Sequence, residues 1–235
     1  MDSSEQLVHE YLKRCGFSSV VYEPDGNVPP DFVADGRVAV EVRRLNQSYT
    51  SSEGHTRDLE EIAIPTWQRM KRLLPTIGAA QSLGTWFVSF HYQRPFGKWS
   101  SIEPKVKAAL TDFLKSPTDQ PTELQIADNF SVDMYKASRS HGSNFILGGA
   151  TDNDAGGFIL AETRKNIRRC SDEKETKIEA YRAKYPEWWL VLPDHIGLGV
   201  SAEDQPDYRR LLVFPHRWDR IVLLDPRGKG QPFAI

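Results

Sequence analysis

The feature that most constrains the fold of this chain is the segment 31–42, which reads Asp-Phe-Val-Ala-Asp-Gly-Arg-Val-Ala-Val-Glu-Val. Short runs rich in valine lie on both sides of Asp35-Gly36, a dipeptide typical of the tight turn between two antiparallel strands. The segment therefore predicts a β-hairpin, and its two acidic ends, Asp31 and Glu41, lie in or beside the two strands.

The register of this hairpin depends on the length of its turn. A two-residue loop would place Asp31 opposite Val40, among apolar side chains, whereas a three-residue loop that includes Arg37 places Asp31 opposite Glu41. With the longer loop, one face of the hairpin is entirely apolar: Phe32, Ala34, Val38, Val40 and Val42. Because a shift of one residue exchanges the two faces of a strand, burial of that apolar face favours the longer loop. The two carboxylates then share the other face.

The rest of the chain predicts an α/β protein, a sandwich of helices around a mixed sheet. Ser3 and Gln6 have the spacing of a capping box, so we expect a first helix that begins there and is closed by Gly16. Hydrophobic periodicity predicts further helices over 57–74, 101–115 and 160–185. It predicts strands at 18–22, 84–92, 123–137, 144–149, 188–192 and 220–224. The run at 84–92 is typical of a strand covered on both faces, and we expect a glycine-rich loop over 148–157.

Length and charge limit the organisation and the partners. A chain of 235 residues fits one large domain or one domain with an insertion, and we predict a single domain over 1–235 because no segment resembles a linker. The net charge of −2 excludes a global basic field, so any contact with nucleic acid requires a local patch. Two cysteines without metal-ligand spacing, and the absence of a long apolar run, predict a cytoplasmic protein that does not enter a membrane.

Pro30-Asp31 followed by Glu41-Val42-Arg43 resembles the motif of the PD-(D/E)XK nuclease superfamily, which has the restriction-endonuclease-like fold. That motif has Pro-Asp at a strand start and Glu-x-Lys in the next strand, so Arg43 stands where the family has lysine. The resemblance implies an αβββαβ core, a mixed sheet flanked by helices. It covers about residues 3–92, and a C-terminal helix and strands at about 140–225 complete the sheet as α/β additions.

The resemblance implies a metal-dependent nuclease, an Mg²⁺-dependent endonuclease acting on DNA or RNA in restriction, repair or defence. Asp31 and Glu41 would bind Mg²⁺ or Mn²⁺, since Mg²⁺ prefers a few carboxylates completed by water. Arg43 would stabilise charge on the phosphate, but a guanidinium cannot serve as a general base because it stays protonated. The departure at Arg43 and the near-neutral charge motivate the alternative, a weak or inactive nuclease-fold protein that binds nucleic acid or another protein. Without a site, Asp31 would only cap the extended Pro29-Pro30 segment, and Glu41 would pair with Arg43 or Arg44 on an exposed face of the sheet.

Three further residues are weaker candidates. Glu5, at the edge of the apolar face of the first helix, would be an extra metal ligand by the same resemblance, or an acidic first-turn residue favoured by the helix dipole. Lys174 lies in line with apolar residues of the long helix, with Lys177 near the edge of that face. Both would contact nucleic acid; alternatively, the stem of Lys174 covers the core and its ammonium reaches solvent. We expect nucleic acid as the partner, DNA ahead of RNA, and leave open a homodimer or a partner protein.

Overall fold

A computed structural model describes residues 1–50, 54–78 and 84–235. The chain divides into two compact units. Unit 1 consists of Met1–Gln47 and Gly156–Ile235, and unit 2 is the continuous segment Ser48–Ala155 inserted between them. The amide of Gly156 donates a hydrogen bond to the side-chain oxygen of Gln47 at 2.9 Å, so the two ends of the insertion lie together in unit 1. The sequence did not predict this division, because neither junction has the composition of a linker.

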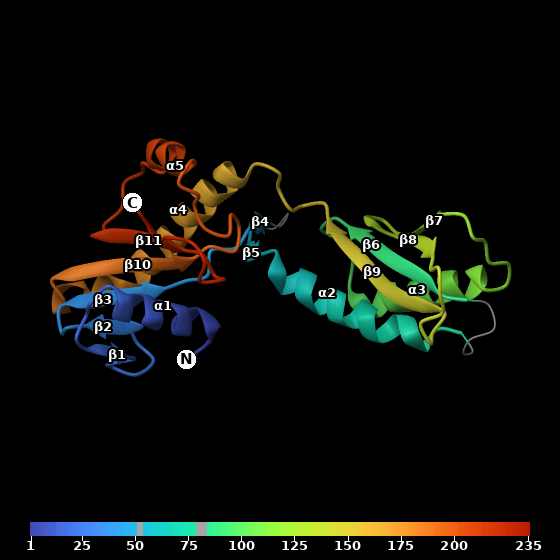
Figure 1. The fold of residues 1–235 in the computed structure, drawn as a ribbon, viewed down its shortest axis with the longest axis horizontal. Helices are drawn as coiled ribbons and strands as arrows, with labels where there is room; N and C mark the ends of the chain where they lie inside the picture. The colour runs from blue at the N-terminus through green and yellow to red at the C-terminus, as the bar shows by residue number, and fades with distance from the viewer. Residues whose placement is uncertain (51–53, 79–83) are drawn as a thin grey trace. The chain divides into compact units, whose positions relative to one another are not determined.

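Unit 1 is built on a six-stranded mixed sheet with the order β1-β2-β3-β10-β11-β12. Figure 1 shows β1, β2, β3, β10 and β11 side by side in this order. The strands are β1 Val20–Tyr22, β2 Phe32–Ala34, β3 Val38–Val42, β10 Glu187–Pro193, β11 Arg220–Leu224 and β12 Phe233–Ala234. β3, β10 and β11 run parallel, and the other neighbouring strands pair antiparallel. The prediction of a mixed α/β protein is confirmed.

Helices cover both faces of this sheet. α1 (Ser3–Arg14) packs on one face, where Val8 and Leu12 contribute to a core with the apolar residues of β2 and β3. α4 (Ile159–Ile178) packs on the other face through Ile167, Cys170 and Ile178. A 3₁₀ helix, η2 (Glu179–Lys184), continues α4, and α5 (Gln205–Leu211) completes the helices of unit 1. The predicted helix over 160–185 therefore ends its α-helical part earlier, at Ile178.

The first helix begins one residue earlier than its sequence predicted. Asp2, rather than Ser3, is the N-cap: its carboxylate accepts hydrogen bonds from the amides of Ser4 and Glu5. The side chain of Glu5 in turn accepts a hydrogen bond from the amide of Asp2, which completes the capping box. A carboxylate has the advantage over a hydroxyl at this position because it carries charge at the positive end of the helix.

Unit 2 has its own sheet, with the order β7-β8-β6-β9, and its own core. Its strands are β4 Ser48–Thr50, β5 Thr56–Asp58, β6 Trp86–Tyr92, β7 Thr122–Ala127, β8 Phe130–Lys136 and β9 Phe145–Asp152. Its helices are α2 Glu60–Leu73, η1 Leu74–Thr76 and α3 Trp99–Phe113. β4 pairs with β5 as a separate ribbon.

Two expectations for this region were wrong. β6 is not covered on both faces: its residues alternate between buried and half-buried, because α2 and α3 contribute to a core on one face only. β9 runs through Gly148 and Gly149 to Asp152, with a register irregularity where it passes β6, so the first part of the predicted glycine-rich loop is a strand. Within the described residues, no helix combines the length and the apolar character needed to cross a membrane.

Candidate active site

The hairpin of β2 and β3 has the longer of the two turns considered from the sequence. Phe32 pairs with Val40 and Ala34 with Val38, so the loop comprises residues 35–37, and the amide of Arg37 donates to the carbonyl of Ala34 at 3.1 Å. The five apolar residues of the predicted face all lie in the core beneath α1. The predicted register is therefore confirmed, and Glu41 points to the opposite face, which α4 covers.

Asp31 lies directly before β2 and is bonded to the neighbouring strand. Its Oδ2 accepts a hydrogen bond of 2.7 Å from the amide of Val42, the last residue of β3. This bond holds the Asp31 carboxylate at the end of β3, beside Glu41. The Asp31 side chain keeps 29% of its surface exposed, so the site is open to solvent on this side.

Glu41 is almost fully buried, with 2% of its side chain exposed. The ammonium of Lys174, from α4, lies between the two acids: its Nζ is 2.5 Å from Glu41 Oε2 and 3.3 Å from Asp31 Oδ2. Within the part of the chain that the structure describes, the second oxygen of Glu41, Oε1, is buried and has no hydrogen-bond partner. Such an oxygen is uncommon in native proteins and marks a position where a further cation or donor would bind.

The electrostatics of the three groups are coupled. Burial raises the pKa of Glu41 above its ordinary value, and the nearby Asp31 adds to the rise, while Lys174 and Lys177 oppose it. Burial disfavours the ammonium of Lys174, but the carboxylates of Glu41 and Asp31 outweigh that effect and raise the pKa of Lys174. Lys174 is therefore a permanent cation in this arrangement, held next to two acidic groups.

The other predicted residues lie around this centre. Arg43 follows β3, and its Nη2 is 3.6 Å from a carboxylate oxygen of Glu173, on α4. The cation that contacts Asp31 and Glu41 is therefore Lys174, from the neighbouring helix, and not Arg43. Lys177 is exposed on the same helix, and its charge opposes the rise in the pKa of Glu41.

The structure does not bring Glu5 to this centre. Its Oε2 accepts hydrogen bonds from the amide of Asp2 and from the hydroxyl of Tyr22, at 2.5 and 3.1 Å. Tyr22 packs on Phe32, which belongs to the α1 side of the sheet. Glu5 therefore caps its own helix, on the face of the sheet opposite to Glu41.

Among the described residues, no group of three or more His, Cys, Asp or Glu side chains has an arrangement suited to a metal ion. The acidic pair of Asp31 and Glu41 is the part of the predicted metal site that the structure brings together. The role of Lys174 had a signal in the sequence, a lysine on the apolar stripe of a helix. That pattern does not predict which group the ammonium contacts. In the structure the ammonium contacts the two carboxylates and does not extend into solvent.

The chain matches none of the family models, curated proteins or solved structures with which it was compared.

Proposed function

We propose that unit 1 is a metal-dependent nuclease that hydrolyses phosphodiester bonds of nucleic acid, DNA in preference to RNA. The observation that carries the proposal is the meeting of Asp31, Glu41 and Lys174 at the end of β3, with one oxygen of the buried Glu41 left without a partner. A buried carboxylate without full hydrogen bonding is costly for stability. The presence of this unpartnered oxygen supports a function that uses it.

The arrangement of elements supports the same proposal. Within unit 1, the chain runs α1-β1-β2-β3-α4-β10; β2 pairs antiparallel with both β1 and β3, and β10 pairs parallel with β3. This is the αβββαβ order that the resemblance implies, once unit 2 is recognised as an insertion between β3 and α4. The helix and strand that complete the order are α4 and β10, and not the helix and strand within residues 57–92.

Asp31 and Glu41 would hold Mg²⁺ or Mn²⁺, with water and the substrate phosphate as the remaining ligands. Such a cation neutralises phosphate charge and acidifies water when it is bound. Lys174 stays protonated, because the two carboxylates raise its pKa, so its Nζ donates hydrogen bonds to a phosphate oxygen and does not abstract a proton. Asp31, being partly exposed, forms the side of the site that faces an incoming strand.

A second candidate has an observation in its favour. Lys174 already lies within hydrogen-bonding distance of both carboxylates, and a buried ion pair of this kind also holds a helix on a sheet. On this alternative, unit 1 is an inactive member of the same fold that binds nucleic acid or another protein. The two candidates differ in whether a divalent cation binds at Asp31 and Glu41.

The test is a cleavage assay on labelled single- and double-stranded DNA and RNA, with Mg²⁺ or Mn²⁺ and with a chelator. We expect metal-dependent cleavage by the wild-type protein. Asp31→Asn and Glu41→Gln should each lower the rate by about two to three orders of magnitude, the scale of losing one electrostatic contact to the transition state. Glu10→Gln is the matched control, since Glu10 is exposed on α1, and it should cleave at the wild-type rate.

Thermal melting separates the two candidates. A cation that binds only the folded state raises the melting temperature by mass action. The wild type should respond to Mn²⁺, and Asp31→Asn should not. Cleavage of equal rate in Asp31→Asn would overturn the nuclease proposal, as would the absence of metal-dependent cleavage on every substrate. In the latter case, an equal thermal response in both proteins would also exclude a metal site at Asp31.

A further inference from the structure

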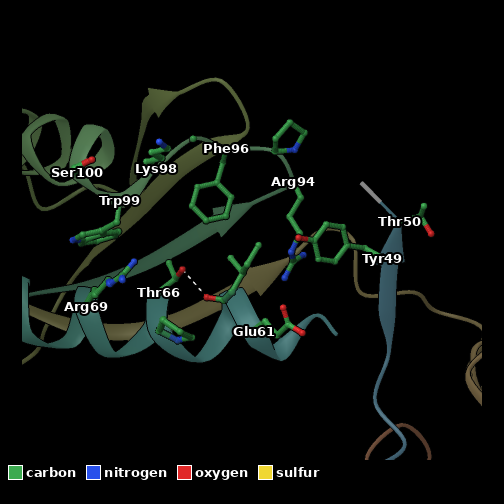
Figure 2. Close-up of a pocket in the computed structure, with 14 residues that line it drawn as sticks. Tyr49, Thr50, Glu61, Thr66, Arg69, Arg94, Phe96, Lys98, Trp99 and Ser100 are labelled. Carbon is green, nitrogen blue, oxygen red and sulfur yellow. Dashed lines mark hydrogen bonds between the residues drawn. The ribbon is translucent and has the colours of Figure 1, made fainter. Parts of the chain in front are cut away.

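Unit 2 contains a cleft of about 770 Å³ between α2 and the segment that joins β6 to α3 (Figure 2). The cleft has an apolar middle, formed by Ile62 and Pro65 of α2 and by Phe96 of the joining segment. Tyr49 lies at one end and Trp99 at the other (Figure 2). A cleft of this volume is in the range of sites that hold a small organic group, and its aromatic side chains suit a flat ring.

Arg94 forms a wall of this cleft and is not a free cation. Its Nη1 lies 2.6 Å from Asp152 Oδ1 and 3.0 Å from Asp154 Oδ2, and its guanidinium stacks on the ring of Tyr49, 4.9 Å from the ring centroid. The two carboxylates neutralise its charge. The Tyr49 end of the cleft therefore holds no excess of positive charge, and Glu61 beside it adds an exposed negative one (Figure 2).

The opposite end is positively charged. Arg69 and Lys98 are exposed and, in the described part of the chain, have no carboxylate partner within salt-bridge distance. The guanidinium of Arg69 lies over the ring of Trp99, 6.0 Å from its centroid. α3 begins at Trp99 without an acidic residue in its first turn, so the helix dipole adds to the same field.

The positive charge extends beyond the cleft. A second hollow of about 410 Å³ shares Arg69 and Trp99 with the first, and the charged residues that its lining adds are Arg72, Glu103 and Lys107. Lys107 is paired with Glu103, but Arg69 and Arg72 continue the row along α2. A row of cations leading away from an aromatic cleft matches a chain of phosphates better than it matches a single phosphate group.

We propose that this cleft binds single-stranded nucleic acid, with one base against Phe96 and the adjoining phosphates on Arg69 and Lys98. The inference rests on the proposed function, to which it adds a substrate contact outside the catalytic centre. Stacking on aromatic rings accepts any base, and the charge row follows the backbone, so the contact would be tolerant of sequence. A base held in a duplex is shielded by its neighbours, which is why the cleft selects an unpaired strand.

The test measures binding without cleavage, by fluorescence anisotropy of a labelled oligothymidylate in the presence of a chelator. An oligomer of about 12 nucleotides falls within the range that single-strand binding modules cover. The double variant Arg69→Ala/Lys98→Ala should bind at least about tenfold more weakly, the scale of losing hydrogen bonds to charged groups. The matched control is Lys71→Ala/Lys105→Ala, which removes equal charge at exposed positions of α2 and α3 outside the cleft.

The salt dependence gives a sharper readout. Each phosphate contact to a single strand contributes roughly 0.7 to the slope of log K against log salt concentration. The slope of the double variant should therefore be smaller by about 1.4, and the control should keep the wild-type slope. Phe96→Leu keeps most of the apolar volume but loses the flat ring. It should weaken binding by about 5- to 150-fold, the scale of one stacked base, with the slope unchanged.

Equal losses in the double variant and its control would overturn the proposal, because they would show a general effect of charge. Binding of thymidine monophosphate as tightly as the oligomer would identify a free nucleotide as the occupant, and equal affinity for duplex would exclude selection of an unpaired strand. Absence of oligomer binding by the wild type would also overturn it. Because the chelator prevents metal-dependent cleavage, binding that persists in a protein that never cleaves would contradict only the proposed function.

Discussion

Lys174 lies 133 residues after Glu41 in the chain, yet its ammonium is 2.5 Å from that carboxylate. Arg43, which lies two residues after Glu41 in the sequence, has its guanidinium beside Glu173. The cation beside Glu41 is thus supplied by a helix and not by the strand that carries Glu41. An ammonium is also the smaller group, and it fits between two carboxylates where a planar guanidinium would require more room.

We therefore expect Lys174→Ala to slow metal-dependent cleavage by about two to three orders of magnitude, because it removes a charged donor from the reacting phosphate. Arg43→Ala should slow it by less than about tenfold, since the Arg43 guanidinium is already paired with Glu173. The measurement is the single-turnover cleavage rate, at a temperature where circular dichroism shows each variant to be folded. A larger loss of cleavage rate in Arg43→Ala than in Lys174→Ala would show that Arg43, and not Lys174, stabilises the reacting phosphate.

The raised pKa of Glu41 predicts a specific dependence of stability on pH. Between the ordinary value of 4.5 and the raised pKa, folded Glu41 keeps a proton that the unfolded chain has lost, so the free energy of unfolding falls as the pH rises. The Glu41→Gln variant has an amide at this position, which does not titrate in this pH range. The stability of the wild type relative to Glu41→Gln should therefore decrease as the pH rises above 4.5.

Urea denaturation at a series of pH values in a metal-free buffer would measure this difference. Glu10 is exposed, so the free energy of unfolding of Glu10→Gln should change with pH as that of the wild type does. A constant difference between wild type and Glu41→Gln would show that Glu41 titrates alike in the folded and unfolded chains, and would contradict the effect of burial.

At the scale of elements, the hairpin of β2 and β3 sets the position of both acids. Its turn has Asp35 and Gly36 at φ of +49° and +66°, in the left-handed region. The Asp35 carboxylate also accepts a hydrogen bond from the amide of Ser19, which ties the turn to the chain before β1. Because the register of the strands follows from the turn, the turn indirectly keeps Asp31 beside Glu41.

Gly36→Val should lower the free energy of unfolding by about 1–2 kcal/mol, because a β-branched residue is disfavoured at this φ. An added Cβ at Gly36 meets no atom within 4 Å, so the loss would come from backbone conformation alone. Gly36→Asn should lose less, since asparagine tolerates this region. Gly157 also has open space around it but no left-handed φ, and Gly157→Val should stay within about 0.5 kcal/mol of the wild type. Equal losses at both glycines, measured by urea denaturation, would exclude the conformational explanation.

At the scale of the whole molecule, the division into two units separates the proposed chemistry from the proposed strand contact. The proposed catalytic centre uses residues of unit 1 only, and the cleft uses residues of unit 2 only. Unit 2 enters and leaves unit 1 at Gln47 and Gly156, which are hydrogen-bonded to each other. An insertion with adjacent ends leaves the host fold continuous.

Replacing residues 48–155 with a short Gly/Ser linker should therefore leave unit 1 folded, with a cooperative thermal transition that Mn²⁺ still raises. The same deletion carrying Asp31→Asn is the control and should not respond to the metal. Differential scanning calorimetry gives both readouts. Loss of the cooperative transition in the deletion would show that the core of unit 1 depends on unit 2.

The sequence alone determined the hairpin, its register and the meeting of Asp31 with Glu41. Apolar and polar residues alternate along the two adjoining strands, and burial of the apolar face permits one register only. It did not determine which helix and strand complete the sheet of unit 1. Residues 57–92 have the periodicity of a helix and a strand, and they form them, but in unit 2. Periodicity reports the type of an element and the face that it buries, not the partner against which that face packs. The placement of Lys174 between the two carboxylates, and the pairing of β10 with β3 beyond an inserted unit, were decided by tertiary packing of segments far apart in the chain.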